Sequence, residues 1–488
     1  MVADSLTWLA VHLGDIVPYG KTEKCELSDV TDDTWILELE DIERDSSKIL
    51  KRLDITERPF KSTKNKFSKG DVLYGKLRPY LNKVVIADKS GVCSTEIIPL
   101  NAEPYLDNRY LFYWLKSEEF LGFVNSVSYG VNMPRLGTKD GLLAPFILAP
   151  LAEQKVIADK LDTLLAQVES TKARLERIPD ILKCFRQSVL TAAVSGKLTE
   201  EWCSNDLDYY KELDAEISQE PKLKKLSTLS DEDIHQAKTL FNGTEWPKWR
   251  LYPLEQLVEP NRGIPYGIVQ TGVPASDGIP TIRCGDVKPL SVDMKDLKLV
   301  SRDIESTYSR TRLVGNEVVL AIRGTVGNAA VITEDMVKSP LNISREVAMI
   351  PVRSNINPKF VAMLLQSPGG YRCLAEKTKG VAQRGINLAD VKRLVTPLPT
   401  YEEQTEIVRR VEGLFAFADN IEQKATAALE RVNNLTQSIL AKAFRGELTA
   451  DWRAANPELI SGENSAEALL AKIQTERTKP VQRKSRRA

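Results

Sequence analysis

The sequence predicts an α/β (α+β) protein with two globular units, each followed by a long helix. The two helices are expected to pair as an antiparallel coiled coil with pseudo-two-fold symmetry. Three observations support this prediction. Residues 154–202 align with residues 404–452 without a gap. Both stretches carry apolar residues at heptad spacing. Each follows a longer stretch in which short strand-like runs mix with turn residues. Such a distant repeat indicates two large halves rather than a solenoid.

Changes of composition along the chain predict the boundaries of its parts. Residues 204–245 carry ten acidic residues against five basic ones and have room for one amphipathic helix. We expect this linker on the surface and mobile. The predicted parts are a globular unit at 1–150, a helix at 151–203, the acidic linker at 204–245, a second globular unit at 246–399, a second helix at 400–460, and a tail at 461–488 that is basic at its end.

The composition suits a globular protein and restricts its location. The chain has 488 residues, is 42% hydrophobic, and carries equal numbers of acidic and basic residues. The six cysteines are scattered, and none forms a Cys-x-x-Cys pair. With no signal-like N-terminus and no apolar stretch long enough to span a bilayer, we expect reduced thiols in a cytoplasmic protein that does not contact a membrane.

The first globular unit has clear strand and helix signals, and the second repeats them loosely. Apolar runs predict strands at Val72–Tyr74, Lys83–Ala87 and Glu96–Leu100, and Asn108–Lys116 reads as a helix. Landmarks of the second unit match those of the first: Trp249 with Trp8, Val318–Ile322 with Val72–Leu77, Ser344 and Glu346 with Ser94 and Glu96, Phe360–Ser367 with Tyr110–Ser117, and Gly380–Val381 with Gly130–Val131. Between the landmarks the units differ, which indicates one fold with two specificities.

The two helices share a heptad seam, although Pro179 is expected to kink or interrupt the first. Three positions of the second seam are alanine, so a partner helix can approach closely. Two matched seams in one chain are most economically packed on each other. The simpler interpretation of one seam is a packed helix with no further role, whereas the second copy favours a functional spacer. The main seam residues are Ile157, Leu161, Leu164, Val168, Leu175 and Leu182 in the first helix, and Ile407, Val411, Leu414, Ile421, Val432 and Leu435 in the second.

Several kinds of chemistry find no support in the sequence. His12 and His235 are the only histidines, and neither lies near cysteines or acids at metal-ligand spacing. There is no nucleophile elbow and no Asn-Pro-Pro-aromatic motif for amino methylation. Gly70–Leu77 nearly fits a phosphate-binding loop, but it ends in leucine and reads as a strand. We therefore predict no catalytic residues, no metal site and no cofactor on this chain.

Basic residues near predicted strand ends and glycine turns are the remaining candidate site. Such residues suit phosphate contacts or bidentate contacts to guanine, although plain surface charge is the simpler interpretation of any single one. Arg78 and Arg323 recur in the two units, and Arg135 and Arg384 lie in corresponding loops, so the set is better supported than any single member. The candidate DNA-binding residues are Lys76, Arg78, Lys83, Arg135 and Lys139 in the first unit and Arg283, Arg323, Arg384 and Lys392 in the second.

The repeated stretches resemble the specificity (S) subunits of type I restriction–modification enzymes, in particular the K family (type IA). The resemblance covers essentially the whole chain. The residues that carry it are Pro150–Gln154, Lys160–Gln167, Glu403–Gln404, Ile407–Val411 and Val432–Thr449.

The resemblance implies a non-catalytic protein that directs the chemistry of others. Each globular unit would be a target recognition domain for one half of a bipartite, asymmetric DNA site, and the conserved helices would separate the two domains. Two methyltransferase (M) subunits would dock on the helices, and two restriction (R) subunits would join for cleavage in phage defence. S-adenosylmethionine would lie on M, and ATP and Mg²⁺ would serve R. The expected methyl acceptor is adenine N6, which must leave the base stack.

Two other functions are distinguishable by experiment. A self-sufficient methyltransferase would methylate DNA as the pure chain, and the missing methylation motif argues against it. A coiled-coil adaptor for proteins alone would not shift duplex DNA together with M. The net charge is zero, and with the linker at −5 the rest of the chain sums to +5. The M subunits would supply the remaining affinity for DNA, so we expect the isolated chain to bind DNA weakly or to be poorly soluble.

Overall fold

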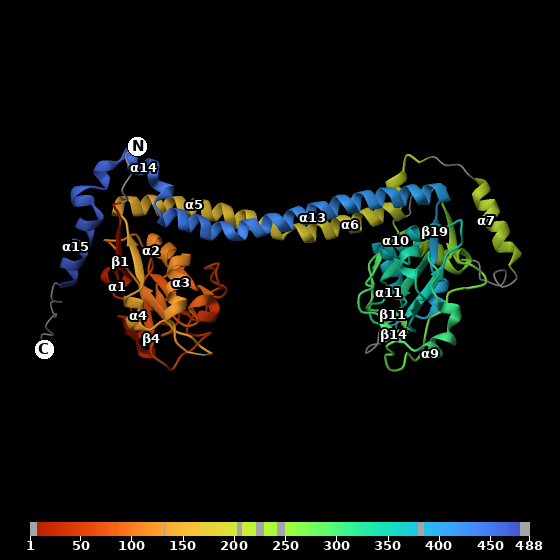
Figure 1. Ribbon diagram of the computed structural model, residues 1–488, viewed down its shortest axis with the longest axis horizontal. Helices are drawn as coiled ribbons and strands as arrows, with labels where there is room; N and C mark the ends of the chain where they lie inside the picture. Colours follow the sequence, from red (N-terminus) through yellow and green to blue (C-terminus); the bar gives the residue numbers. More distant parts are fainter. Residues whose placement is uncertain are drawn as a thin grey trace. The chain divides into compact units, whose positions relative to one another are not determined.

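Two compact units make up the protein (Figure 1). The structure is a computed structural model that describes residues 7–130, 132–202, 207–220, 229–241, 249–378 and 385–478. Unit 1 consists of Met1–Glu176 with Thr426–Ala488, and unit 2 consists of Arg177–Ala425. Each unit takes helical residues from both copies of the repeat, so neither copy builds a unit by itself. No helix in the described part of the chain is long and apolar enough to cross a membrane.

Head 1, defined as residues 9–148, has an α+β fold. The three strands and the helix predicted here are confirmed, and the strands form one sheet in the order β6-β5-β8. A second sheet has the order β2-β4-β7-β3. The elements are β1 (Leu9–His12), α1 (Leu13–Ile16), β2 (Lys24–Cys25), β3 (Trp35–Leu37), β4 (Lys64–Phe67), β5 (Val72–Gly75), β6 (Val84–Ile86), β7 (Gly91–Cys93), β8 (Ile97–Leu100), α2 (Asn108–Leu115), α3 (Glu118–Val127), α4 (Thr138–Leu142) and β9 (Pro145–Leu148).

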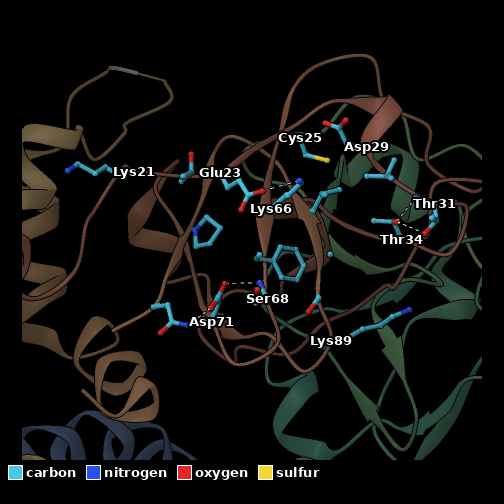
Figure 2. Close-up of a pocket in the computed structure, with 18 of the residues that line it drawn as sticks. Lys21, Glu23, Cys25, Asp29, Thr31, Thr34, Lys66, Ser68, Asp71 and Lys89 are labelled. Atoms are coloured by element: carbon cyan, nitrogen blue, oxygen red, sulfur yellow. Dashed lines mark hydrogen bonds and ion pairs between the residues drawn. The ribbon is translucent and has the colours of Figure 1, made fainter. Parts of the chain in front are cut away.

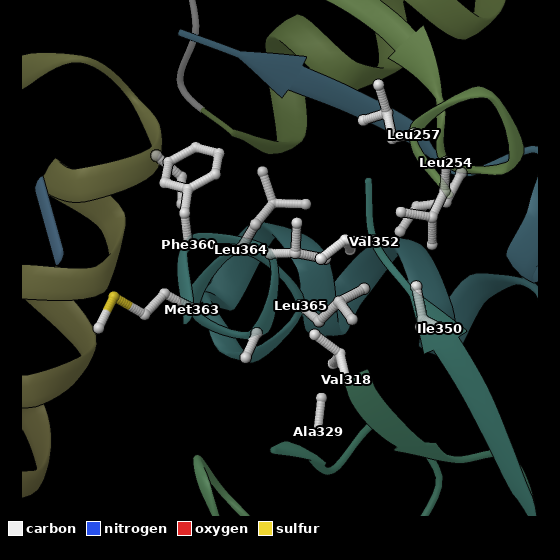
Figure 3. Close-up of a cluster of buried hydrophobic side chains, with 14 of the residues drawn as sticks. Leu254, Leu257, Val318, Ala329, Ile350, Val352, Phe360, Met363, Leu364 and Leu365 are labelled. Carbon is white, nitrogen blue, oxygen red and sulfur yellow. The ribbon is translucent and has the colours of Figure 1, made fainter. Parts of the chain in front are cut away.

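Head 2, defined as residues 250–398, repeats this plan with a sheet in the order β16-β15-β18. Figure 3 shows α10 beside the sheet: Leu365 lies toward Val318, and both are buried. The elements are β10 (Arg250–Pro253), β11 (Ile279–Ile282), β12 (Val287–Lys288), β13 (Ser291–Val292), β14 (Lys298–Val300), α9 (Arg302–Ser306), β15 (Glu317–Ala321), β16 (Ala329–Val331), β17 (Asn342–Ile343), β18 (Val347–Pro351), α10 (Pro358–Gln366), α11 (Pro368–Glu376), α12 (Leu388–Lys392) and β19 (Val395–Leu398).

The first and last strands of each head pair with each other. In head 1, β1 runs antiparallel to β9, with Leu9 opposite Leu148. In head 2, β10 runs antiparallel to β19, with Arg250 opposite Leu398. Both ends of a head therefore lie side by side, directly before the long helix that follows the head.

Pro179 interrupts the first long helix, as predicted. Helix α5 (Leu151–Glu176) ends before Arg177, and α6 (Ile178–Val194) starts with Pro179 in its first turn. A proline there lacks the amide hydrogen that would continue the α5 hydrogen-bond ladder. The second long helix, α13 (Tyr401–Phe444), has no proline and is continuous.

Within each unit the long helices pack antiparallel (Figure 1). In unit 1 the start of α5 lies beside the end of α13, because Ile157 and Leu161 share a core with Leu440. In unit 2 the end of α6 lies beside the start of α13, because Val189 shares a core with Ile407.

The predicted seam residues differ in their exposure. Seven are buried, namely Ile157, Leu161, Val168, Leu182, Ile407, Val411 and Val432. Four are half-buried, namely Leu164, Leu175, Leu414 and Ile421. Leu435 is 44% exposed, so its assignment to the seam is wrong. At that level of α13, Gln437 turns toward the head and donates to the Lys116 carbonyl (3.1 Å), which leaves Leu435 outside.

At the base of each head, where the head meets its long helix, a buried glutamate binds residues that are far apart in the sequence. In unit 1, Glu153 accepts hydrogen bonds from the Trp8 indole (2.8 Å) and the Thr449 hydroxyl (2.7 Å), and it pairs with Arg453. In unit 2, Glu403 accepts from the Trp249 indole (3.1 Å) and from Thr199 (2.8 Å). We call these residues the glutamate clusters. In both, the tryptophan belongs to the head's first strand region and the threonine to the other copy of the repeat.

The glutamine that directly follows each buried glutamate fixes the start of the long helix. Gln154 accepts from the Asp107 amide (3.1 Å) and donates to the Ala149 carbonyl (2.7 Å). Gln404 makes the same pair of bonds with the Asn357 amide (2.8 Å) and the Pro399 carbonyl (2.9 Å). Both glutamines are fully buried, so their amides must be satisfied inside the protein.

The described linker residues are exposed or half-buried except for Tyr210, Leu213, Ala237, Leu240 and Phe241, so the predicted surface position is confirmed for them. Its described residues form α7 (Leu207–Gln219) and α8 (Asp231–Leu240). Leu213 and Phe241 are buried in the core of unit 2, and Asp214 and Glu216 bind head 2 through Arg250 and Arg353. In unit 1, helix α15 (Ala466–Thr478), which follows α14 (Ala450–Ala455), likewise buries Leu469 and Ile473 in the core.

The substitution Glu153→Gln is expected to loosen the base of head 1. Glu153 is fully buried and the Arg453 side chain is 10% exposed, and an uncompensated buried charge costs about 3 kcal/mol. Hydrogen exchange should therefore accelerate about 100-fold at the amides that join β1 to β9.

Glu169→Gln is the matched control in the same helix. Glu169 is 50% exposed and lies 3.9 Å from Lys48, so the change should cost about 0.5 kcal/mol or less. Equal acceleration in both variants would contradict the role assigned to Glu153.

Candidate nucleic-acid interface

Three of the basic residues predicted in head 1 meet where β5 ends. The Lys76 amide donates to the Glu96 carbonyl (3.0 Å), and the Lys76 carbonyl accepts from the Leu136 amide (3.0 Å). The Arg78 amide donates to the Pro134 carbonyl (2.7 Å). The end of β5, the start of β8 and the loop that carries Arg135 therefore form one surface.

Arg78 has an unusual backbone and an unpaired side chain. Its φ of 50° lies in the left-handed region, which is strained for a residue with a β-carbon and is often found at functional sites. Its Nε is buried without a hydrogen-bond partner. Within the described residues, neither Arg78 nor Lys76 forms an ion pair, so both retain positive charge for an anionic ligand.

Arg135 is held by a carboxylate. Its Nε donates to Glu96 Oε2 at 3.1 Å, and the two side chains are 39% and 26% exposed. Its backbone pairs with Tyr129 through hydrogen bonds of 2.9 and 3.3 Å. The charge of Arg135 is thus largely balanced, but the direction of its side chain is fixed.

Two exposed aromatic residues lie near these cations and were not predicted from the sequence: Tyr80 by its place in the chain, and Tyr129 by its backbone pairing with Arg135. Tyr80 is 51% exposed directly after the Arg78 turn, and Tyr129 is 61% exposed beside Arg135. Tyrosine hydroxyls commonly bind DNA phosphates. Their only sequence signal is their place beside Pro79 and Gly130 in turns.

The other two predicted residues of head 1 lie elsewhere. Lys83 donates to the Leu39 carbonyl (2.6 Å), and burial lowers the pKa of its ammonium group. Lys83 therefore serves the fold of head 1. Lys139 is exposed on α4 and has no ion-pair partner within the described ranges.

Head 2 builds the same surface at the end of β15. The Ile322 amide donates to the Glu346 carbonyl (2.9 Å), and the Ile322 carbonyl accepts from the Ile386 amide (3.0 Å). Arg323 forms an antiparallel β-bridge with Gly385, as Leu77 does with Arg135 in head 1. The exposed Arg323 lies on this surface.

The structure corrects the predicted equivalence of Arg78 with Arg323. Val72 pairs with Leu100 and Val318 with Ile350, so Val72 corresponds to Val318. Counting from there, Arg323 corresponds to Leu77, and Arg78 corresponds to Gly324. Gly324 has a φ of 65° where Arg78 has 50°, which supports this register. The two arginines therefore differ by one position, and side chains alternate direction along a strand.

Of the other residues predicted in head 2, two are tied to carboxylates. Arg283 donates to both oxygens of Asp286 (3.0 Å each), and these bonds raise its pKa. Lys392 lies 3.2 Å from Glu255. Arg384 lies outside the described residues. Arg345, which the sequence analysis missed, is exposed in the turn beside Glu346.

Glu96 and Glu346 occupy the same position in the two heads but hold different partners. Glu96 binds Arg135, whereas Glu346 accepts from the Cys284 thiol at 3.2 Å. Burial and this hydrogen bond raise the pKa of Cys284, which keeps the thiol protonated as the donor. The shared surface thus presents different chemistry in each head.

Unit 1 also has a surface hollow of about 600 Å³ beside the sheet of β2 and β4 (Figure 2). Both lysines and carboxylates line it. Lys66 pairs with Glu23 (3.0 Å), and the Ser68 amide donates to Asp71 (2.7 Å). Its charges therefore favour neither a phosphate nor a cation.

Comparisons with known proteins agree with this architecture. The chain matches the model of the type I restriction modification DNA specificity domain over residues 6–180 and 277–431. It is 44% identical over 390 residues to the type I restriction enzyme EcoBI specificity subunit of Escherichia coli, covering 79% of this chain and 74% of that protein. It is 38% identical over 382 residues to the EcoKI specificity subunit of Escherichia coli strain K12, covering 78% and 74%.

Solved structures share the fold at low identity. One chain, from work on complex assembly and conformational transition of the type I R-M system, has a TM-score of 0.62 at 17% identity and covers 90% of this chain and 98% of its own. The HsdS subunit from Thermoanaerobacter tengcongensis has a TM-score of 0.57 at 19% identity, with coverage of 90% and 97%. Given the family match on both halves and relatives 44% and 38% identical over most of the chain, the protein belongs to the family of type I restriction–modification specificity subunits.

Proposed function

We propose that this chain gives a type I restriction–modification complex its DNA sequence specificity, with each head reading one half of a bipartite, asymmetric site. The chain itself is not an enzyme. It directs adenine N6 methylation or cleavage by its partners. Lys76 and Arg78 in head 1 and Arg323 in head 2 are the residues we assign to DNA contact, with Lys139 as a further phosphate contact.

One observation carries this proposal: a common backbone frame presents different side chains in the two heads. The strand end, the glutamate and the facing loop recur, but Arg135 is replaced by Gly385 and Arg78 by Gly324. A shared frame positions both heads alike on a duplex, and its changed side chains alter the contacts that each head makes with DNA.

The catalytic groups belong to other subunits in this proposal. Two M subunits carry S-adenosylmethionine, and two R subunits use ATP and Mg²⁺. The complex works in the cytoplasm, where it meets the duplex DNA of host and phage.

The direct test is methylome sequencing of a host that expresses this chain with its M subunit. We expect N6-methyladenine within one asymmetric, bipartite motif, and none when either subunit is expressed alone. Methylation by the pure chain would contradict the proposal, as would methylation at an undivided motif.

The helices between the heads are proposed to set the gap between the half-sites. One helical turn is about 5.4 Å, or about one and a half base pairs at ~3.4 Å each. A turn inserted into α5, matched by one in α13 to keep the pairing, should change the gap by one or two base pairs. Altered bases with an unaltered gap in the methylome would refute this role.

The long helices also carry exposed apolar side chains that suit a protein partner. Ile181 and Phe417 are each 62% exposed, and Leu435 is 44% exposed. Burying such exposed apolar side chains against a partner is favourable, and we assign them to contacts with the M subunits.

Phe417→Glu is expected to weaken association with M about thirtyfold, because losing a buried aromatic contact commonly costs about 2 kcal/mol. Calorimetric titration of M with the variant measures it. Leu207→Glu is the control, since Leu207 is 60% exposed on α7 and lies outside the long helices. Equal affinities for both variants would exclude Phe417 from the interface.

A further inference from the structure

Arg135 has a more rigid setting than the other basic residues of head 1. Its backbone makes two hydrogen bonds with Tyr129, and it bridges to Leu77. The residues on either side are fixed as well, because the Pro134 carbonyl accepts from Arg78 and the Leu136 amide donates to Lys76. A side chain mounted on such a frame is positioned more accurately than one on a free loop.

The side chain of Arg135 is also oriented. Only its Nε donates to Glu96, at 3.1 Å, and an arginine has four further N–H donors on its two terminal nitrogens. Within the described residues these terminal nitrogens have no hydrogen-bond partner. The side chain is 39% exposed, so the terminal edge is accessible to a ligand with two adjacent acceptors.

The nearby carboxylate distinguishes a base contact from a phosphate contact. Phosphate binding gains mostly from net positive charge and counterion release, and Glu96 offsets the charge of Arg135. A contact to a base edge depends instead on donors held in fixed positions, and the hydrogen bond to Glu96 holds the Arg135 side chain in place. The O6 and N7 atoms of guanine present the pair of acceptors that an arginine fork fits. Lys76 and Arg78, which form no ion pair within the described part of the chain, suit the phosphate role.

Head 2 lacks this arrangement. Gly385 stands at the bridging position of Arg135, and the glutamate of the shared frame accepts from Cys284 instead. Among the residues that the structure describes, an arginine held in this way occurs in head 1 and not in head 2, so its effect should be confined to one half-site.

We propose that Arg135 is a specificity-determining residue that reads a guanine in the half-site of head 1, with Glu96 as its positioning residue. This inference rests on the proposed function, because it names the base contact of the same DNA-binding surface.

The test compares variants of the full chain, each assembled with its M subunit, by methylome sequencing and by DNA binding at several salt concentrations. Arg135→Ala should make one guanine position of one half-site degenerate, with discrimination reduced about 10- to 100-fold. The other half-site should not change. Arg78→Ala is the contrast: it should weaken binding to all sequences and lower the salt slope by about 0.9, without altering any base preference.

Two conservative variants keep the test decisive if Arg135→Ala folds poorly. Arg135→Lys keeps the charge but lacks the fork, and it should lose guanine discrimination. Glu96→Gln should reduce discrimination and raise the salt slope, because the charge of Arg135 is no longer offset. Unchanged base preferences in Arg135→Lys would overturn the inference, as would a response of Arg135→Ala that matches Arg78→Ala. A wild-type complex that methylates no bipartite site would instead refute the proposed function.

Discussion

The buried glutamate at the base of each head is the interaction on which the rest of the structure depends. A carboxylate removed from water is costly unless several donors satisfy it. Glu153 obtains its donors from Trp8 at the start of head 1, and from Thr449 and Arg453 in the other repeat. It can be satisfied only when both ends of the chain and the first long helix come together. The cluster of Glu403 imposes the same requirement on unit 2.

This requirement separates a constant part of the protein from a variable part. The glutamate clusters, the buried glutamines and the paired end strands fix where each head starts and ends. They place little demand on the loops that follow β5 and β15. Those loops share backbone hydrogen bonds but not side chains, so Arg135 in one head corresponds to Gly385 in the other. A protein that must read two different half-sites needs this combination.

The sequence predicted the fold class and most of the long helices because their signals are periodic and repeated. It also predicted the strands of head 1 and the interruption at Pro179. Prediction from the sequence was wrong where the contacting residues lie far apart in the chain. Lys83 is held by Leu39, and nothing in the local sequence indicates this contact. The equivalence of Arg78 and Arg323 failed by one residue, because the register follows from strand pairing. The acidic composition of the linker gave no sign that a few apolar residues, among them Leu213, attach its helices to the core of unit 2.

Each head is proposed to carry its own specificity on an interchangeable base. The most direct measurement is the methylome of a chain in which residues 250–398 are replaced by residues 9–148, with Trp249 and Glu403 retained. If the account is right, this chain and its M subunit will methylate a symmetric site made of the first half-site and its inverted copy. Retention of the original asymmetric motif would contradict it.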